Sequence, residues 1–480
     1  MKIKLRNNTS SLVSNSIWSL IGTFTSKGLM FLAWMFVANT LGKTVNGEIG
    51  VLRSTLSIFI SIIGTGFGVT LTKFLPKHRY EDPEKVNKII SLTFCSSIVL
   101  GLLISLVYWL LSPWLANDIL LAPHLLVVIK LNTLLLFFSI LNGVALGFLQ
   151  GFEKFRALAF VNTVFGVILF ISLYIGALKY EIEGVFIGFI FATVIGLIIS
   201  LYFILKVFKE YKIILTNKFL SEAWILKYFT LPAILSGVAV IPFKWGLETL
   251  LVRQERGFSE MGLFAAIFLF HNLLLMGVNT LNAPLIISMT KDQNNKKIGQ
   301  INLLLPWVIG FVAMLPVLVF PEILGLFLKA EYIKDKNFSF TVFMIAIITI
   351  LVLFKNGMSR IMIVHDLMWF SFLSNFIWGF TLITTFFFME TKNAVTMALS
   401  YVIAYFINIL IVIPVYVRKN IIPLNIIYSK WAVLIWTVFF AVIGVVFSNL
   451  VINIYYKLAM LTFCLLGVLF SFYKIIEDEK

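Results

Sequence analysis

The chain alternates between long apolar stretches and short polar turns, from about residue 12 to about residue 473. A helix needs about 20 mostly apolar residues to cross a hydrocarbon layer of about 30 Å, and about fourteen stretches reach that size. Because backbone polar groups cannot stay unpaired in lipid, we predict that each stretch is a membrane-spanning helix. The stretches lie near residues 12–38, 49–75, 89–112, 122–148, 157–178, 184–206, 226–250, 259–289, 300–320, 338–364, 368–389, 394–417, 429–449 and 452–473.

Composition leads to the same fold class. Hydrophobic residues make up 60% of the 480 positions and charged residues 12%, and the mean hydropathy is +1.01. A soluble domain carries roughly 25% charged residues. The sequence therefore predicts an all-α integral membrane protein.

The formal net charge of +16 invites a nucleic-acid partner, but the positions of the basic residues argue against one. If the N-terminus is cytoplasmic, about 25 of the 38 Lys and Arg fall on the inside and about 10 on the outside. This asymmetry is typical of membrane topology, in which basic residues gather on the cytoplasmic side. We expect both termini to be cytoplasmic and expect no nucleic-acid partner.

A weak internal repeat divides the chain. Residues 47–50 (GEIG) follow the first apolar stretch, and residues 259–262 (SEMG) follow the seventh at the same register. An even number of helices per half predicts parallel repeats. We therefore expect two pseudo-symmetric six-helix lobes around a central cavity, followed by two further helices. The predicted boundaries are 1–210, 211–420 and 421–480.

A few basic residues interrupt the apolar stretches. Lys27 lies near the middle of the first, where a lysine costs about 2.5–3.5 kcal/mol on insertion. Such a residue is a candidate for binding, although a lysine can also cap helix carbonyls inside a bundle. Lys130 and Lys244 also lie inside stretches. Arg53 and Arg253 lie near the outer ends, where they line a cavity mouth or serve as interfacial anchors.

Other polar residues share faces of the predicted helices. Ser26 lies on the polar side of the first helix, and Glu248 is one helical turn from Lys244, where the two either pair or face a cavity. His271, Asn272, Asn279 and Asn282 fall within an arc of roughly 100° on one helix, so this face is expected to point inward. Glu248 and His271 are candidates for a proton relay, and a histidine packed by a hydrogen bond is the alternative.

Acidic residues are scarce at the centres of the stretches, with Glu248 the nearest. A cavity lined by cations has a positive potential, which suits an acidic or phosphorylated solute. We find no motif for a catalytic nucleophile, a nucleotide or a metal, and Cys95 and Cys464 lie far apart in apolar stretches. The sequence predicts a transporter without cofactor, metal or catalytic residues; the alternative of another class is a membrane-embedded polymerase or acyltransferase.

Four segments of the chain form a series of motifs: residues 37–50 (VANTLGKTVNGEIG), 64–68 (GTGFG), 149–156 (LQGFEKFR) and 259–266 (SEMGLFAA). In their order and spacing they resemble the motifs of the polysaccharide transporter family. This family comprises the Wzx-like flippases of lipid-linked O-antigen and other oligosaccharides, within the multidrug/oligosaccharidyl-lipid/polysaccharide exporter superfamily. Where this chain has Asn39 the family commonly has arginine, so Lys27 or Arg53 is expected to take that role.

The resemblance implies a substrate and a location. The substrate is an undecaprenyl-pyrophosphate-linked repeat unit, which alternating access moves to the periplasmic leaflet of the bacterial inner membrane. Lys27, Arg53, Lys130, Lys244 and Arg253 would then hold the phosphates. Ser26, Asn272, Asn279 and Asn282 would contact sugar hydroxyls. The implied partners are the lipid-linked glycan, membrane lipid, and a polymerase or other glycan-assembly proteins; the alternative is a multidrug exporter of the same superfamily.

Overall fold

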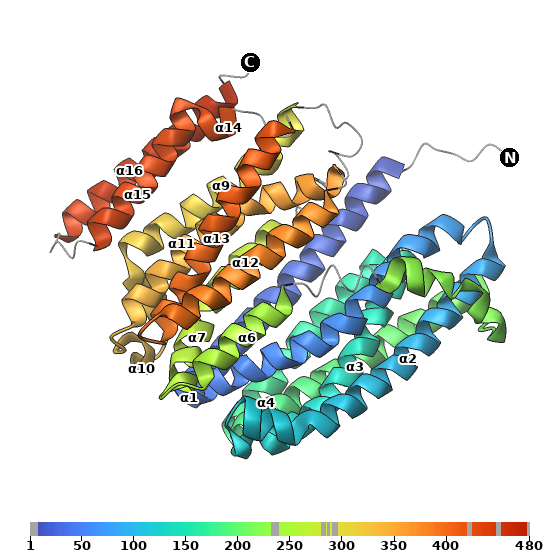
Figure 1. The fold of residues 1–480 in the computed structure, drawn as a ribbon. Coiled ribbons are helices and arrows are strands. Elements are labelled where there is room, and N and C mark those ends of the chain that lie inside the picture. Colours follow the sequence, from blue (N-terminus) through green and yellow to red (C-terminus); the bar gives the residue numbers. More distant parts are fainter. Residues whose placement is uncertain are drawn as a thin grey trace. The chain divides into compact units, whose positions relative to one another are not determined.

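The structure is a computed structural model that describes residues 8–231, 240–279, 285, 289, 296–365, 367–419, 425–447 and 453–477. The regular elements among these residues are all helices (Figure 1). The membrane-protein fold class is confirmed. The long helices are α1 (Asn8–His78), α2 (Pro83–Trp114), α3 (Leu126–Gly151), α4 (Phe155–Tyr211), α6 (Ile241–Val252), α7 (Gly257–Asn279), α9 (Lys296–Val319), α11 (Phe338–Val364), α12 (Met368–Phe388), α13 (Ala394–Arg418), α15 (Lys430–Phe447) and α16 (Ile454–Glu477). The short ones are η2 (Leu115–Ile119), η3 (Pro123–Leu125), η4 (Asn217–Glu222), η5 (Leu226–Thr230), η6 (Pro321–Phe327), α10 (Ala330–Ile333) and α14 (Asn425–Tyr428).

Two of the long helices each contain two predicted crossings. The backbone of α1 leaves helical geometry at Gly42, whose φ of 81° suits a residue without a side chain. The backbone of α4 does so at Tyr180 and Glu181, with a φ of 47° at Glu181. These breaks fall between the apolar stretches that the sequence separates. Within the described residues, ten helices are long and apolar enough to span a membrane.

The chain divides into two compact units, Met1–Glu255 and Arg256–Lys480. In the first unit, α1 packs along both α3 and α4, and α3 also packs on α2 and α4 (Figure 1). Glycines permit the closest of these approaches: a Cβ atom built on Gly147 of α3 would lie 2.3 Å from the Cα of Gly68 in α1. Small residues at helix contacts are a common way to pack helices in lipid.

The second unit is built on α9 and α11, which pack together and also contact α16 and α13 respectively. Aromatic rings from α9, α11, α15 and α16 meet in one buried cluster. Its members are Trp307, Phe311, Phe354, Trp436, Phe439 and Phe472. The two terminal helices are therefore part of this unit's core. The finer division at residues 210 and 420 stays a prediction.

Candidate functional site

The helix α6 is fixed against the second half of α1 by a polar contact. The indole Nε1 of Trp245 donates a hydrogen bond of 3.0 Å to Oγ1 of Thr55, which is buried. The same hydroxyl donates to the carbonyl of Val51 one turn earlier, at 2.8 Å. This chain of hydrogen bonds sets the rotation of α6 and brings Lys244 and Glu248, on either side of Trp245, toward α1.

Arg53 of α1 lies over an aromatic ring. Its Cζ is 3.8 Å from the centroid of Trp34, which belongs to the other half of α1 and is only 3% exposed. A guanidinium stacked on an indole is held in orientation by the ring quadrupole, while its N–H groups stay able to bind an anion. The kink at Gly42 brings these two residues, 19 positions apart, face to face.

Three further charged groups are linked to Arg53, either directly or through Glu248. Glu248 is buried and within electrostatic reach of both Arg53 and Lys244. Lys27 interacts with Arg53 as a like charge, and its side chain is solvent-exposed. We call Lys27, Arg53, Lys244 and Glu248 the cationic cluster. An exposed lysine beside a half-buried arginine leaves this group of cations accessible to an anion.

The other sequence-predicted cations of the first unit lie elsewhere. Lys130 is exposed, and its Nζ is 5.8 Å from the ring centroid of Trp109, which is itself 47% exposed. Arg253 is exposed at the end of α6 and donates from Nη2 to the carbonyl of Asp118, at 3.2 Å. Arg253 therefore ties the end of α6 to η2. The described contacts of both residues are with groups outside the cationic cluster.

Ser26 is buried beside Lys27. It is 6% exposed, and a Cβ on Gly166 of α4 would lie 2.9 Å from its Cα. Ser26 therefore occupies the place where α1 crosses α4. Its neighbour Lys27 is exposed, so the two residues lie in different surroundings although they are adjacent in the chain.

The predicted polar residues of the second unit lie on α7. Asn272 and Asn279 are exposed, and Oδ1 of Asn279 accepts a hydrogen bond of 2.9 Å from Nδ2 of Asn356. Asn282 lies outside the described residues. His271 is buried, with Nδ1 2.8 Å from Oγ1 of Thr349. Since the Thr349 hydroxyl donates to a backbone carbonyl at 2.7 Å, its oxygen accepts the Nδ1 proton of His271.

The second unit also contains a buried arginine that is not among the candidate residues of the sequence. Arg360 lies in α11 and is 1% exposed. Its Nη1 donates to Oδ1 of Asn302 at 3.0 Å and to the Asn302 backbone carbonyl at 3.3 Å, and its Nη2 donates to Asn356. The amide of Asn302 also donates to the carbonyl of Gly357, at 2.8 Å. This network joins α9 to α11 inside the unit.

Two residues of these sites escaped prediction. Trp34 looked like one more apolar residue, because nothing in the sequence shows that the kink at Gly42 brings it under Arg53. Arg360 lies inside the stretch 338–364 that the sequence predicts to be a helix, but it is not one of the candidate residues because that end of the stretch is polar. The available signal was the charge itself, since α11 runs from Phe338 to Val364 and includes Arg360.

Comparison with known proteins places the chain in a family. Residues 12–284, more than half of the chain, match the polysaccharide biosynthesis protein family. A curated relative, the uncharacterized membrane protein MJ1375 of Methanocaldococcus jannaschii, is 26% identical over 337 residues, covering 65% of this chain and 76% of that protein.

Two solved structures share the fold. The lipid II flippase MurJ in an inward closed conformation has a TM-score of 0.70 at 14% identity, covering 96% of this chain and 99% of MurJ. A multidrug resistance transporter of the MATE family and MOP superfamily, in an inward-facing conformation, has a TM-score of 0.67 at 13% identity, covering 85% of this chain and 98% of that one. The chain belongs to the polysaccharide biosynthesis protein family and is a multi-pass membrane protein that shares the fold of these two structures.

Proposed function

We propose that this membrane protein is a transporter, a flippase for a polyprenyl-pyrophosphate-linked oligosaccharide, which it moves from the cytoplasmic to the outer leaflet of a bacterial cytoplasmic membrane. The single observation that carries the proposal is the cationic cluster. Arg53 and Lys244 lie within electrostatic reach of Glu248, and Lys27 lies within reach of Arg53. Lys27 and Arg53 belong to a candidate membrane span, residues Phe24–Ile60. We infer the glycan part of the substrate from the family, and the anionic carrier from the cationic cluster.

The chemistry of the cluster suits a pyrophosphate. Moving an unpaired multiply charged anion into hydrocarbon costs on the order of tens of kcal/mol by Born solvation. Arg53 offers a planar pair of donors that matches phosphate oxygens, and Lys27 and Lys244 add ammonium groups. With these partners the headgroup crosses in a polar surrounding while its polyprenyl chain remains in lipid.

Glu248 limits how tightly the anion is bound. In the empty protein its carboxylate lies within electrostatic reach of Arg53 and Lys244. An arriving pyrophosphate has to compete with this internal anion, so its net affinity is lower than three free cations would give. A flippase needs such a balance, because a substrate bound too firmly would not leave on the other side.

The rest of the mechanism follows from the family fold. Asn272 and Asn279, exposed on α7, are suited to hydrogen-bond sugar hydroxyls. Movement of one lobe against the other would change the leaflet to which the site opens. The basic residues on the inside segments orient the protein with both termini in the cytoplasm.

The test uses purified protein in proteoliposomes with a defined pyrophosphate-linked glycan. We expect Arg53→Gln and Lys244→Gln each to reduce flipping by about tenfold or more, the loss of one hydrogen bond to a charged group. Lys130→Gln is the matched control, since it removes a membrane lysine whose described contact is with Trp109. Equal flipping by wild type and both cluster variants would overturn the proposal.

A second arm tests the substrate class. The same glycan on a neutral polyprenyl ether should be transported poorly, because it offers the cations nothing to bind. If the neutral carrier is moved as fast as the pyrophosphate, the anionic headgroup is not what the protein recognises. If only cationic dyes are transported, the protein is instead a multidrug exporter of the superfamily.

A further inference from the structure

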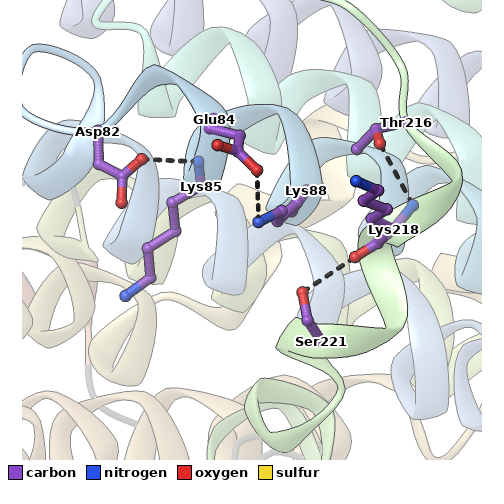
Figure 2. Close-up of polar contacts among 7 residues, drawn as sticks. All are labelled: Asp82, Glu84, Lys85, Lys88, Thr216, Lys218 and Ser221. Atoms are coloured by element: carbon purple, nitrogen blue, oxygen red, sulfur yellow. Dashed lines mark hydrogen bonds and ion pairs between the residues drawn. The ribbon is translucent and has the colours of Figure 1, made fainter.

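The segment between α4 and α6 is fixed to the surface of the first unit. We call residues 212–231 the linker segment. The backbone N–H of Ile214 donates to Oδ1 of Asn87 at 3.2 Å, and that of Thr216 donates to Oγ of Ser91 at 2.9 Å. Both acceptors belong to α2. These bonds hold η4 along the beginning of α2. Figure 2 shows Lys218 and Ser221 of η4 together with Glu84 and Lys88 of α2.

The far end of the linker segment is fixed as well. Oγ1 of Thr230 and Oγ1 of Thr70 in α1 are 2.8 Å apart, and both residues are buried. Phe229 packs edge-on against Phe74, and Nζ of Lys73 lies 3.8 Å from the Phe229 ring centroid. Both ends of the linker segment are therefore held on the first unit, and one side of the segment stays exposed.

The exposed side of the linker segment carries many apolar side chains. Its large apolar and aromatic side chains are more than 45% exposed, and tyrosine and tryptophan are among them. They are Ile214 (70%), Leu215 (60%), Leu220 (69%), Trp224 (46%), Tyr228 (68%) and Leu231 (51%). Tryptophan and tyrosine are enriched where proteins meet lipid headgroups, because their rings are amphipathic.

Lysines accompany these apolar side chains. Lys212, Lys218 and Lys227 are exposed, and within the described residues none of the three has an ion-pair partner at 4.0 Å. Two acids near the segment pair with other lysines: Glu84 with Lys88 at 2.7 Å (Figure 2), and Glu210 with Lys154 at 2.7 Å. Glu222, inside the segment, accepts a hydrogen bond of 3.0 Å from Nε1 of Trp224.

The linker segment itself carries a net positive charge. Residues 212–231 contain Lys212, Lys218 and Lys227, and Glu222 is the one acidic residue among them. Exposed lysines in excess over acids give a positive local potential, which attracts anions.

We infer that the linker segment is a binding surface for anionic phospholipid headgroups of the membrane that surrounds the protein. Its exposed apolar side chains enter the headgroup layer, and Lys212, Lys218 and Lys227 contact the phosphates of anionic lipids. An apolar face with flanking lysines is the pattern of segments that lie in the membrane interface. The inference is independent of the transported substrate.

The test compares lipid nanodiscs of phosphatidylcholine with nanodiscs that contain three parts in ten phosphatidylglycerol. The full-length protein is used in both. We expect the wild type to unfold at a higher temperature in the anionic discs and to retain phosphatidylglycerol in native mass spectrometry. The triple variant Lys212→Gln, Lys218→Gln, Lys227→Gln should lose most of this shift, with retention falling about fivefold for each lysine.

The matched control removes the same charge elsewhere. Lys329→Gln, Lys334→Gln, Lys336→Gln replaces three exposed lysines within eight residues of the second unit, and it should keep the wild-type shift. A second variant, Leu220→Ser with Tyr228→Ser, removes apolar contacts and should reduce the shift while the lysines remain.

Three results would overturn the inference. The first is a wild-type melting temperature that is the same in both lipids. The second is a triple linker variant that keeps the full shift, or a control variant that loses it equally. The third is an equal shift when inorganic phosphate is added to phosphatidylcholine discs, which would indicate a site for the free anion.

Discussion

Each unit keeps an arginine within a membrane-spanning helix, and the two arginines are stabilised differently. Arg53 of the first unit is half-buried, stacks on Trp34 and has other charged groups as neighbours. Arg360 of the second unit is 1% exposed and donates to amide and backbone oxygens of α9 and α11. The first arrangement leaves donors for a ligand, and the second uses donors to join two helices.

This difference shows that a charge in a membrane helix does not by itself mark a site. Removing a cation that serves the structure should destabilise the protein, whereas removing one that serves binding should reduce transport alone. Stability and transport can be measured separately, so single variants can show whether the cations of the two units differ in this way.

The largest effect is expected at Asn302, which accepts from Arg360 and is fully buried. Asn302→Ala removes the side-chain oxygen that accepts from this buried guanidinium, and the loss of a hydrogen bond to a charged group costs about 1.5–3 kcal/mol. Chemical unfolding in detergent would measure the loss. Asn272→Ala, an exposed position, is the control and should change stability little. A stable Asn302→Ala protein would mean that Arg360 does not join the helices.

The next effect concerns transport. Lys27→Ala should reduce flipping about tenfold or more while the free energy of unfolding changes by less than about 0.5 kcal/mol, as for an exposed side chain. Lys27→Arg preserves the charge and should retain most activity. If Lys27→Ala lowers the free energy of unfolding enough to account for the lost flipping, Lys27 is a structural cation like Arg360.

A smaller change is expected when the acid of the cationic cluster is neutralised. Glu248→Gln removes the internal competitor for Arg53 and Lys244. A soluble pyrophosphate-containing headgroup analogue should then bind about fivefold more tightly, from loss of a nearby like charge. Isothermal titration measures the affinity. Weaker binding would show instead that Glu248 orients the cations.

The smallest effect is expected at Thr349, the partner of His271. Thr349→Val should cost about 1 kcal/mol of stability for the lost hydrogen bond. Transport measured between pH 5.5 and 8.5 should keep its wild-type pH profile, since we expect His271 to be a packing residue. A changed profile would show that His271 relays protons.

The sequence was sufficient for most of the fold. The breaks at Gly42 and Glu181 fall between apolar stretches, because only chain outside the hydrocarbon can abandon helical hydrogen bonding without cost. The i,i+4 spacing of Lys244 and Glu248 also brings them within electrostatic reach, as a helix requires.

The candidate site was less predictable, because it depends on contacts between distant residues. Lys130 and Lys27 look alike in sequence, yet one lies over exposed Trp109 and the other beside Arg53. Local patterns do not reveal which neighbour a long side chain meets. In the same way, Ser26 shares a polar helix side with Lys27 but is buried where α1 crosses α4.

The contact between Gly68 and Gly147 has a consequence for how this family of sequences can vary. A methyl group on Gly147 would lie 2.3 Å from the Gly68 backbone, so even alanine would force α1 and α3 apart. In a library that samples every substitution, position 147 should therefore be among the least tolerant in the chain. It would be intolerant for a purely geometric reason, without touching any cargo.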